Sequence, residues 1–351
     1  MKKFKIGFVG VGFFSQVAYL KNLIKRKDTE LTAIAEAKPK LRLSIKKKYQ
    51  IKNIFPTHLD LIKSKIKLDI IFVITARKFM PLIVNDCLKS NFNVFSEKPM
   101  ASNSFQAKKI ISSSKKSRSM YFSGYMRRFD KGVVKAKKII QKKIRDKSFG
   151  NLISVSVKGY DANPYCNEND YIKAEKNIGI NLDSWKTFPS WIKKSKRSEY
   201  ASFINRFSHD INLLRFFFNE KTPNVIFSKV KDYQGNVIMK LNKVNINFEN
   251  KILNFKNRME TFEFYFEKAI IKIFLPHALA KNKPSKVEIY EKKGKFDKQS
   301  TIYEDWSWSF DNQIDYVLKS LKNKKNKILN AQNSLKDIML IEEIWKKNVE
   351  K

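Results

Sequence analysis

The stretch KIGFVGVGFFS, residues 5–15, decides the fold of this chain. It begins as an apolar strand pattern and becomes a helical pattern at Phe13, directly after Gly10-Val11-Gly12. In a G-x-G-x-x-G turn the first glycine allows the tight bend, and the second lets the backbone approach a phosphate. Ser15 is a small residue where the third glycine usually lies. The helix N-terminus offers N–H groups to a pyrophosphate, so Gly10, Gly12, Phe13 and Phe14 are predicted to bind a dinucleotide.

Around this turn, strand and helix patterns alternate as far as residue 123. The run DIIFVIT, Asp69–Thr75, is continuously apolar, as in strands that are buried on both faces of a parallel sheet. This alternation predicts an α/β fold, with a doubly wound parallel sheet over residues 1–123. The expected strands are Lys5–Val9, Leu31–Ala35, Asp69–Thr75, Asn93–Phe95 and Met120–Ser123, and the expected helices are Phe13–Lys27, Pro39–Tyr49, Phe79–Ser90 and Ser102–Ser117.

From Gly124 onward, strand patterns follow one another with few long helices between them. This order is typical of a mostly antiparallel sheet with one open face, so residues 124–351 are predicted to form a second α/β domain. Its expected strands are Leu152–Gly159, Asn224–Val230, Val237–Phe248, Phe262–Leu275 and Lys286–Glu291, and its expected helices are Lys131–Arg145, one that starts near His209, Ser309–Lys322 and Ala331–Val349.

Glu36 ends the second predicted strand. A carboxylate at this place accepts hydrogen bonds from the adenosine ribose hydroxyls and repels a 2′-phosphate, which favours NAD over NADP. Thr75 and Ala76, at the end of the Asp69–Thr75 strand, are expected to contact the same cofactor. The alternative is a structural turn with a solvated Glu36.

The tripeptide Glu97-Lys98-Pro99 follows the strand that ends at Phe95. Lys98 is therefore expected at the carboxyl edge of the sheet, where open α/β sheets bind ligands. A lysine there can donate to a substrate hydroxyl or carbonyl and stabilise developing negative charge. Glu97 and Lys98 are predicted at the cofactor, with Lys98 also catalytic and in contact with substrate. A solvated Lys98 is the alternative, and Pro99 is a candidate for a cis peptide bond.

These motifs together resemble the Gfo/Idh/MocA family, the family of glucose-fructose oxidoreductase and inositol dehydrogenase. The resemblance runs nearly end to end through the G-x-G turn, Glu36, Thr75, EKPMA at 97–101, GYMRRFD at 124–130, SHDINLLR at 208–215 and the closing helical pair. It implies a Rossmann domain followed by an α/β domain whose open sheet is often used for oligomerisation. It also implies hydride transfer at a carbon of a sugar, nucleotide sugar or cyclitol.

Members of that family usually carry Asp, then His four residues later, then Asp three beyond, whereas this chain has Asn205, His209 and Asn212. On a helix these spacings keep three side chains on one face. His209 is expected at a helix N-terminus, whose dipole keeps the imidazole a neutral base. The resemblance implies that His209 and Asn205 take part in catalysis and that Asn205, His209 and Asn212 contact substrate. The missing carboxylates leave a non-catalytic relative open as an alternative.

Two further features are expected near the substrate. Arg127 is predicted to meet a substrate phosphate or carboxylate, as its neighbour Arg128 could, and the alternative is an interdomain salt bridge. The long segment Asp161–Arg197 contains Trp185 and other aromatic residues that suit stacking on a sugar ring or a base. It is a candidate substrate lid, and a segment packed on the sheet is the alternative.

Composition limits the class of protein. The net charge is +39, but only 11 of the 72 basic residues are Arg, and the lysines are scattered along the chain. Proteins that recognise nucleic acids favour Arg, so AT-rich codons explain the charge more simply than nucleic-acid binding does. Attraction of an anionic substrate, a nucleic acid or an acidic membrane is the alternative. Cys87 and Cys166 lie outside any metal-ligand spacing, so no metal site is expected. No signal peptide or membrane span is expected, and a reducing cytoplasm fits.

The leading hypothesis is a cytoplasmic, homo-oligomeric (dimeric or tetrameric), NAD-dependent dehydrogenase. It would act on a CH–OH group of a sugar, nucleotide sugar or cyclitol, with NADP disfavoured. The alternative is a non-catalytic, regulatory relative that binds NAD and a ligand on the same fold. Nucleic-acid binding is a third class, which the scattered lysines disfavour.

Overall fold

The structure is a computed structural model that describes residues 3–162, 170–175, 183–231, 233–254 and 258–348. It divides into two compact units, which are described separately below. The units differ from the division at residue 123, because two later segments join the first unit. Unit 1 comprises Met1–Gly124, Glu168–Trp191 and Gln313–Leu335, and unit 2 comprises Tyr125–Asn167, Ile192–Asn312 and Lys336–Lys351.

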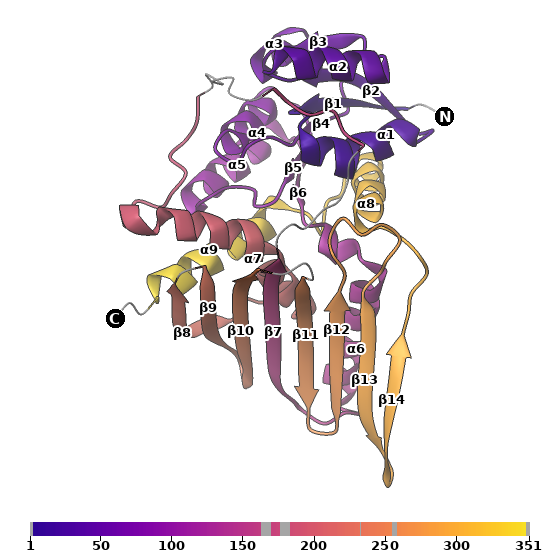
Figure 1. Cartoon of the computed structure of the whole chain (residues 1–351), viewed down its shortest axis with the longest axis vertical. Coiled ribbons are helices and arrows are strands. Elements are labelled where there is room, and N and C mark those ends of the chain that lie inside the picture. The colour runs from indigo at the N-terminus through magenta and orange to yellow at the C-terminus, as the bar shows by residue number, and fades with distance from the viewer. Residues whose placement is uncertain (1–2, 163–169, 176–182, 232, 255–257, 349–351) are drawn as a thin grey trace. The chain divides into compact units, whose positions relative to one another are not determined.

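Unit 1 is built on a six-stranded parallel sheet in the order β3-β2-β1-β4-β5-β6 (Figure 1). The strand order reverses between β1 and β4, the point at which doubly wound sheets bind ligands beyond their carboxyl ends. The predicted parallel sheet is confirmed, and β3 is a short additional strand. The strands are β1 (Phe4–Val9), β2 (Thr29–Ala35), β3 (Asn53–Phe55), β4 (Ile70–Val73), β5 (Val94–Glu97) and β6 (Tyr121–Gly124).

The helices of unit 1 bury a core of aromatic rings against this sheet. Tyr19 packs against Phe95 with ring centroids 5.2 Å apart, and Phe95 lies 4.7 Å from Phe72. The helical run from Phe13 passes through a π-helical stretch, η1 (Ser15–Leu20), which carries Tyr19. The further helices are α1 (Lys21–Lys25), α2 (Pro39–Tyr49), α3 (His58–Lys63), α4 (Met80–Lys89) and α5 (Ser104–Ser117).

The late segment Gln313–Leu335 is an integral part of unit 1. The side-chain oxygen of Gln313 accepts a hydrogen bond from the Tyr19 hydroxyl at 3.2 Å. The backbone oxygen of Leu329 accepts one from the N–H of Ser123 in β6 at 3.0 Å. The segment includes most of α8 (Ser309–Asn323) and the start of α9 (Ala331–Lys346).

Unit 2 is built on an eight-stranded sheet in the order β14-β13-β12-β11-β7-β10-β9-β8. All neighbouring pairs are antiparallel except β7 and β10, so the predicted mostly antiparallel sheet is confirmed. Side chains along β12 alternate between buried and partly exposed, as in a sheet with one covered face. The strands are β7 (Leu152–Ala162), β8 (Asn224–Lys231), β9 (Gln234–Leu241), β10 (Val244–Leu253), β11 (Met259–Phe266), β12 (Ala269–Leu275), β13 (Lys286–Lys293) and β14 (Phe296–Ile302).

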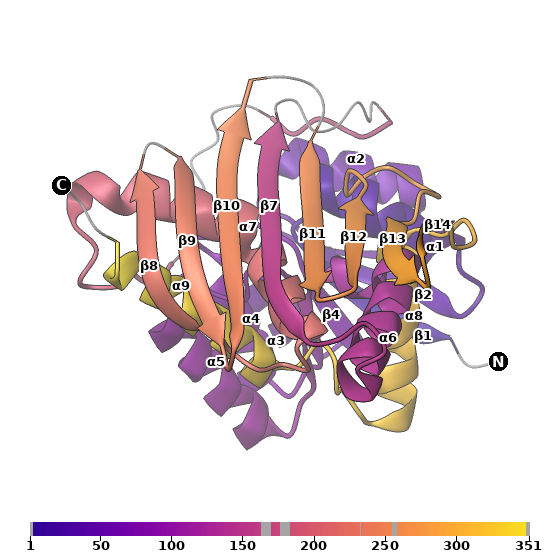
Figure 2. The ribbon, with the colours of Figure 1, turned by 90° about the horizontal axis from the view of Figure 1, so that it is seen from below.

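Helices α6 (Lys131–Asp146) and α7 (Arg197–Phe217) pack on this sheet (Figure 2). The ring of Phe217 at the end of α7 lies 5.2 Å from the ring of Phe264 in β11. Two short 3-10 turns, η2 (Met126–Phe129) and η3 (Lys194–Lys196), precede these helices.

Two segments that were predicted as single strands are hairpins. Val237–Phe248 divides into β9 and β10, and Phe262–Leu275 divides into β11 and β12. The first turn passes through Asn242 at φ 54°, which asparagine tolerates in place of the glycine that usually announces such a turn. The second turn, at Glu267 and Lys268, likewise has no glycine or proline.

The predicted start of a helix near His209 is wrong. Helix α7 begins at Arg197, so His209 lies more than three turns inside it and not at its N-terminus. The earlier turns are helical because Tyr200, Phe203 and Phe207 recur at helical spacing and are all buried in unit 2. The helix dipole therefore does not act on His209 as expected, because that effect falls off within the first turn.

Candidate active site

The glycine turn of unit 1 requires glycine at its first position. Gly10 has φ 84°, and a Cβ there would lie 2.5 Å from the backbone oxygen of Ile74. Its own N–H donates to the backbone oxygen of Ala35 at 2.9 Å. A side chain would therefore strain the backbone and collide with the end of the neighbouring strand.

Gly12 is a different case, because its surroundings in the protein do not require glycine. A Cβ on Gly12 would meet no described atom within 4 Å, and its φ is not positive. The missing side chain leaves open space where the helical run begins at Phe13. A phosphate approaching the amides of that helix start needs this kind of space.

Ser15 performs the packing role of the third glycine. Its hydroxyl donates to the backbone oxygen of Gly10 at 2.7 Å and also lies 3.1 Å from that of Ile74. It is 1% exposed. The serine therefore ties the glycine turn to the chain leaving β4.

Glu36 lies directly after β2 and is fixed against the glycine turn. Its Oε2 accepts a hydrogen bond from the N–H of Val11 at 2.9 Å, and its Oε1 accepts one from the N–H of Lys38 at 3.1 Å. An ionised carboxylate has about four acceptor sites, so two such bonds leave capacity for ribose hydroxyls. With the open position at Gly12, these residues fit the adenosine and pyrophosphate portions of a dinucleotide.

Glu97 and Lys98 lie at the carboxyl end of β5, as predicted. The Tyr19 hydroxyl donates to Oε1 of Glu97, and the N–H of Lys98 donates to Oε2 at 3.1 Å. Burial raises the pKa of Glu97, although the bond from Tyr19 and the charge of Lys98 oppose this rise. The Lys98–Pro99 bond is cis, and the Lys98 side chain is half-buried.

The predicted residues of unit 1 share one edge of the sheet. Strands β1, β4 and β5 are neighbours, and their carboxyl ends lead to Gly10, to Thr75 and to Lys98. Thr75 is half-buried and Ala76 is exposed. The half-buried Phe13 contacts Tyr171 edge to face, with ring centroids 4.7 Å apart, and Phe14 lies edge to face against Tyr19.

In unit 2, helix α7 carries Asn205, His209 and Asn212, so the helical spacing is confirmed. Asn205 and His209 are half-buried, and the His209 ring lies edge to face with that of Tyr125 at 5.9 Å. Lys98 belongs to unit 1 and His209 to unit 2, and their meeting at one substrate hydroxyl stays a prediction.

Asn212 differs from the other two because it is 2% exposed and bonded inside unit 2. Its amide oxygen accepts from Nε of Arg128 at 2.6 Å, and its amide nitrogen donates to Asp337 at 2.6 Å. Arg128 also pairs with Glu220 at 2.7 Å, and Asp337 pairs with Arg215. These bonds join α7 to η2 and α9 and give Asn212 a structural task.

Arg127 likewise makes internal contacts. Its guanidinium donates to Glu260 at 2.6 Å and to the backbone oxygen of Pro276 at 2.7 Å, and it is 2% exposed. The ion pair lies within unit 2, so it is not the interdomain salt bridge that was the alternative.

Arg127 belongs to a buried cluster of charges that the sequence did not reveal. Arg258 pairs with Glu260 and with Asp161, each at 3.2 Å, and Asp161 also pairs with Arg206. Burial raises the pKa of Asp210, and the charge of Glu260 adds to the rise. Burial and the charges of Arg258 and Arg127 lower the pKa of His277 to about 4. These residues are spread over η2, β7, α7, β11 and the chain beside β11 and β12, so no local motif marks the cluster.

The described residues 170–175 and 183–191 of the predicted lid belong to unit 1, whereas its first two and last six residues belong to unit 2. The backbone oxygen of Lys186 accepts hydrogen bonds from Asn103 at 3.2 Å and from Gln106 at 2.8 Å. The ammonium of Lys109 lies 4.9 Å from the ring of Trp185. Residues 163–169 and 176–182 of this segment, with Cys166, lie outside the described residues.

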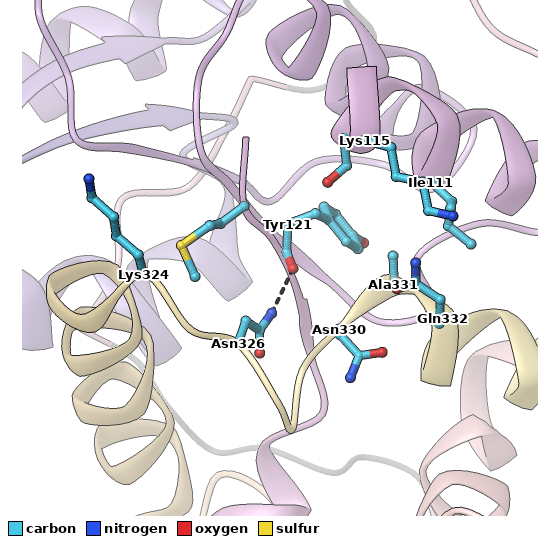
Figure 3. A pocket seen from close by; sticks show the side chains of 10 residues that line it. Ile111, Lys115, Tyr121, Lys324, Asn326, Asn330, Ala331 and Gln332 are labelled. Carbon is cyan, nitrogen blue, oxygen red and sulfur yellow. Dashed lines mark hydrogen bonds between the residues drawn. The ribbon is translucent and has the colours of Figure 1, made fainter. Parts of the chain in front are cut away.

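A pocket of about 200 Å³ also lies in unit 1, between α5, β6 and the segment from Lys324 to Gln332 (Figure 3). Asn326 crosses it and donates to the backbone oxygen of Tyr121 at 2.8 Å. Tyr121 is the first residue of β6, so the pocket lies at the amino end of that strand. Ligands of open α/β sheets bind at the opposite ends, so this pocket is not assigned to the active site.

The described residues hold neither a candidate metal site nor a candidate membrane span. No group of His, Cys, Asp or Glu there could hold a metal ion. Within the same residues, no helix has the length and apolar character that crossing a bilayer requires.

The chain is similar to known proteins in sequence and in structure. Residues 4–125 match the family model described as an oxidoreductase family with an NAD-binding Rossmann fold, Gfo/Idh/MocA. The myo-inositol 2-dehydrogenase of Thermotoga maritima is 26% identical over 137 residues, which are 39% of this chain and 40% of that protein. The chain thus matches less than half the length of this relative.

Solved structures match the chain over nearly its whole length. An aldose-aldose oxidoreductase from Caulobacter crescentus, complexed with glycerol, has a TM-score of 0.75 at 17% identity and covers 99% of this chain and 97% of its own. A variant of KijD10, a 3-ketoreductase from Actinomadura kijaniata in complex with TDP-benzene and NADP, has a TM-score of 0.75 at 10% identity, covering 99% and 98%. At such identities the likeness shows the fold alone, and the family model confirms the resemblance drawn from the sequence over residues 4–125.

Proposed function

Residues 4–125 match the model of the Gfo/Idh/MocA family of NAD-binding oxidoreductases, and from this premise we propose that the chain is an NAD-dependent dehydrogenase. Its substrate is a sugar, nucleotide sugar or cyclitol, oxidised or reduced at one carbinol carbon. The observation that carries the proposal is the carboxyl edge of the unit 1 sheet. There the open position at Gly12, the fixed carboxylate of Glu36 and the ammonium of Lys98 follow β1, β2 and β5.

Each residue has a defined task in this proposal. When bound, the nicotinamide ring supplies the hydride acceptor, or the donor in the reverse direction. Glu36 accepts hydrogen bonds from the adenosine ribose hydroxyls and favours NAD over NADP. Lys98 donates to the reacting hydroxyl oxygen and stabilises the charge that develops as its proton leaves.

Unit 2 supplies the proton acceptor in this proposal. The imidazole of His209 takes the hydroxyl proton, and Asn205, one turn earlier on α7, holds a substrate hydroxyl. Asn212 is left to the internal network with Arg128 and Asp337, because both ends of its amide are bonded there. Arg127 is likewise assigned to its pair with Glu260.

Turnover tests this proposal directly. The purified chain is incubated with NAD⁺ and a panel of sugars, nucleotide sugars and cyclitols, and with NADH and the corresponding keto compounds. Lys98→Ala is expected to lower turnover about 10²-fold or more while NAD affinity stays nearly unchanged, because the lysine acts on the proton. Lys89→Ala, which removes an exposed lysine from the last turn of α4, serves as the matched control and is expected to keep full turnover.

A second candidate function rests on one observation, the amide at position 205 where the family usually has a carboxylate. A non-catalytic protein that binds NAD and a ligand would need no charged group there. Absence of turnover with every compound of the panel, combined with measurable NAD binding, would establish this second function.

We also propose that the chain forms a cytoplasmic homo-oligomer through the unit 2 sheet. Tyr265, Ile270 and Tyr290 are cross-strand neighbours on β11, β12 and β13 and are each partly exposed. Such an apolar and aromatic group suits a self-complementary interface. Sedimentation equilibrium gives the mass, and a monomer at micromolar concentration would refute this part.

A further inference from the structure

A short part of the predicted lid crosses the nucleotide-binding face of unit 1. We call residues Asp170–Glu175 the strap. The backbone of Ile172 pairs with the side-chain amide of Gln16, with bonds of 2.8 and 3.0 Å. At the strap's first residue, the carboxylate of Asp170 pairs with Lys21 at 2.9 Å and with Lys48 at 3.1 Å. The strap therefore contacts both the helical run after the glycine turn and helix α2.

At its other end, the strap caps helix α2. The carboxylate of Glu175 accepts hydrogen bonds from the N–H groups of Lys40 at 2.6 Å and Leu41 at 3.2 Å. Pro39, the first residue of α2, has no N–H, and the N–H of Arg42 already donates to the backbone oxygen of Lys38 at 2.9 Å. Glu175 therefore uses the donors that the first turn of α2 has to offer.

The carboxylate of Glu175 occupies N–H groups that the 2′-phosphate of NADP would need as hydrogen-bond donors. Glu36, which marks the position of the adenosine ribose, is three residues before the start of α2. A phosphate on the ribose 2′-oxygen would therefore face the N-terminus of α2 and Lys38. The ammonium of Lys38 donates to the backbone oxygen of Glu175 at 2.8 Å, so the strap also engages this cation.

We propose that Glu175 is a second determinant of cofactor specificity, which excludes NADP by occupying the α2 amides and by repelling the 2′-phosphate. This inference rests on the proposed function, because it assumes that a dinucleotide binds at the glycine turn. It assigns part of the discrimination to a residue of the strap that lies 139 residues after Glu36.

The charge of Glu175 persists at neutral pH. Burial acts to raise its pKa, but hydrogen bonds from its own N–H and those of Lys40 and Leu41, with the charge of Lys38, outweigh that effect and lower it. The carboxylate and a phosphate dianion would then compete for the same amides with like charges. The discrimination is expected to weaken only in acid, as the pH falls through the lowered pKa.

Isothermal titration with NAD⁺ and with NADP⁺ tests the inference on the full chain. Glu175→Gln keeps the shape of the side chain and removes its charge. We expect it to tighten NADP⁺ binding about tenfold, which is about 1.4 kcal/mol, and to change NAD⁺ affinity less than twofold. Glu175→Ala, which also vacates the amides, is expected to tighten NADP⁺ binding at least as much.

Asp170→Asn is the matched control, because it removes a carboxylate from the same strap without exposing the N-terminus of α2. It is expected to leave the ratio of the two dissociation constants within twofold of wild type. The inference is overturned if Glu175→Gln leaves that ratio unchanged. It is also overturned if Asp170→Asn shifts the ratio as much as Glu175→Gln does, since the strap would then act only by covering the site. Tighter binding of both cofactors to Glu175→Ala would also overturn it and would indicate an autoinhibitory strap.

Failure of the proposed function has a different signature. A wild-type chain that binds neither NAD⁺ nor NADP⁺ would refute the dinucleotide site itself. If the glutamine variant does not fold, AMP and adenosine 2′,5′-bisphosphate, which differ only in the 2′-phosphate, are compared on the wild-type chain and on Glu175→Ala. A preference for AMP that is lost in Glu175→Ala supports the inference, and one that stays unchanged overturns it.

Discussion

The two glycines of the first turn are expected to respond to substitution in opposite ways. Gly10→Ala adds a methyl group to a residue at φ 84°, which costs about 1–2 kcal/mol. The methyl carbon would also start 2.5 Å from the backbone oxygen of Ile74, and overpacking of this kind costs about 1–3 kcal/mol. The sum of about 2–5 kcal/mol corresponds to a fall in Tm of roughly 5–20 °C in a unit of this size.

Gly12→Ala places its methyl group in open space and in an ordinary backbone conformation. The free energy of unfolding is expected to change by less than about 0.5 kcal/mol. NAD⁺ affinity is expected to fall tenfold or more, about 1.4 kcal/mol, because the methyl group fills the space that the pyrophosphate needs.

Thermal unfolding followed by circular dichroism, and titration with NAD⁺, measure the two effects. Gly294→Ala is the control for backbone strain alone, because Gly294 has φ 65° but no described atom within 4 Å of a Cβ. It is expected to cost about 1–2 kcal/mol and to leave NAD⁺ affinity unchanged. The reasoning is refuted if Gly12→Ala lowers Tm as much as Gly10→Ala, or if Gly12→Val binds NAD⁺ as tightly as wild type.

Three further outcomes are expected. The wild-type chain binds NAD(H) at least tenfold more tightly than NADP(H), about 1.4 kcal/mol, and Glu36→Ser reduces this difference in affinity in the same titrations. Equal affinities of the wild-type chain for the two cofactors would show that Glu36 does not contact the ribose. Asn205→Asp shifts the pH profile of an active enzyme, and if it instead creates turnover in an inactive one, the binding-protein function is correct. Stability measured by urea unfolding falls as the pH drops from about 6.5 to about 4, because the lowered pKa of His277 makes the unfolded state bind the proton first. His277→Gln is expected to flatten that decline, and an unchanged slope would assign it to other groups.

The sequence predicted the first sheet well because its signals are local. Strands β1 and β4 are largely apolar runs, and the glycine-rich turn follows β1 directly in the sequence. The short strand β3 has three half-buried residues and offered no comparable run. The hairpin turns at Asn242 and at Glu267 use residues that are common elsewhere, so two hairpins were read as single strands.

A site residue could be predicted from the sequence only where its role follows from its place in a single strand or helix. Glu36 and Lys98 each follow a strand, and that position is visible in the sequence. Asn212 looked like its neighbours on α7, but its contacts with Arg128 and Asp337 depend on residues 84 and 125 positions away. Glu175 was missed for the same reason, since the amides that it caps lie 135 positions earlier in the chain.

The composition of unit 1 has a consequence for synthesis on the ribosome. Strand β6 bonds to Leu329, and Tyr19 bonds to Gln313, so the unit is complete only when residue 335 has emerged. Roughly 200 residues separate Gly124 from that point, which is a delay of about 10–40 s at ordinary rates of translation. The domain that begins first in the chain therefore finishes late, and the nascent chain must carry the parallel sheet without its last helical segment while most of unit 2 is being made.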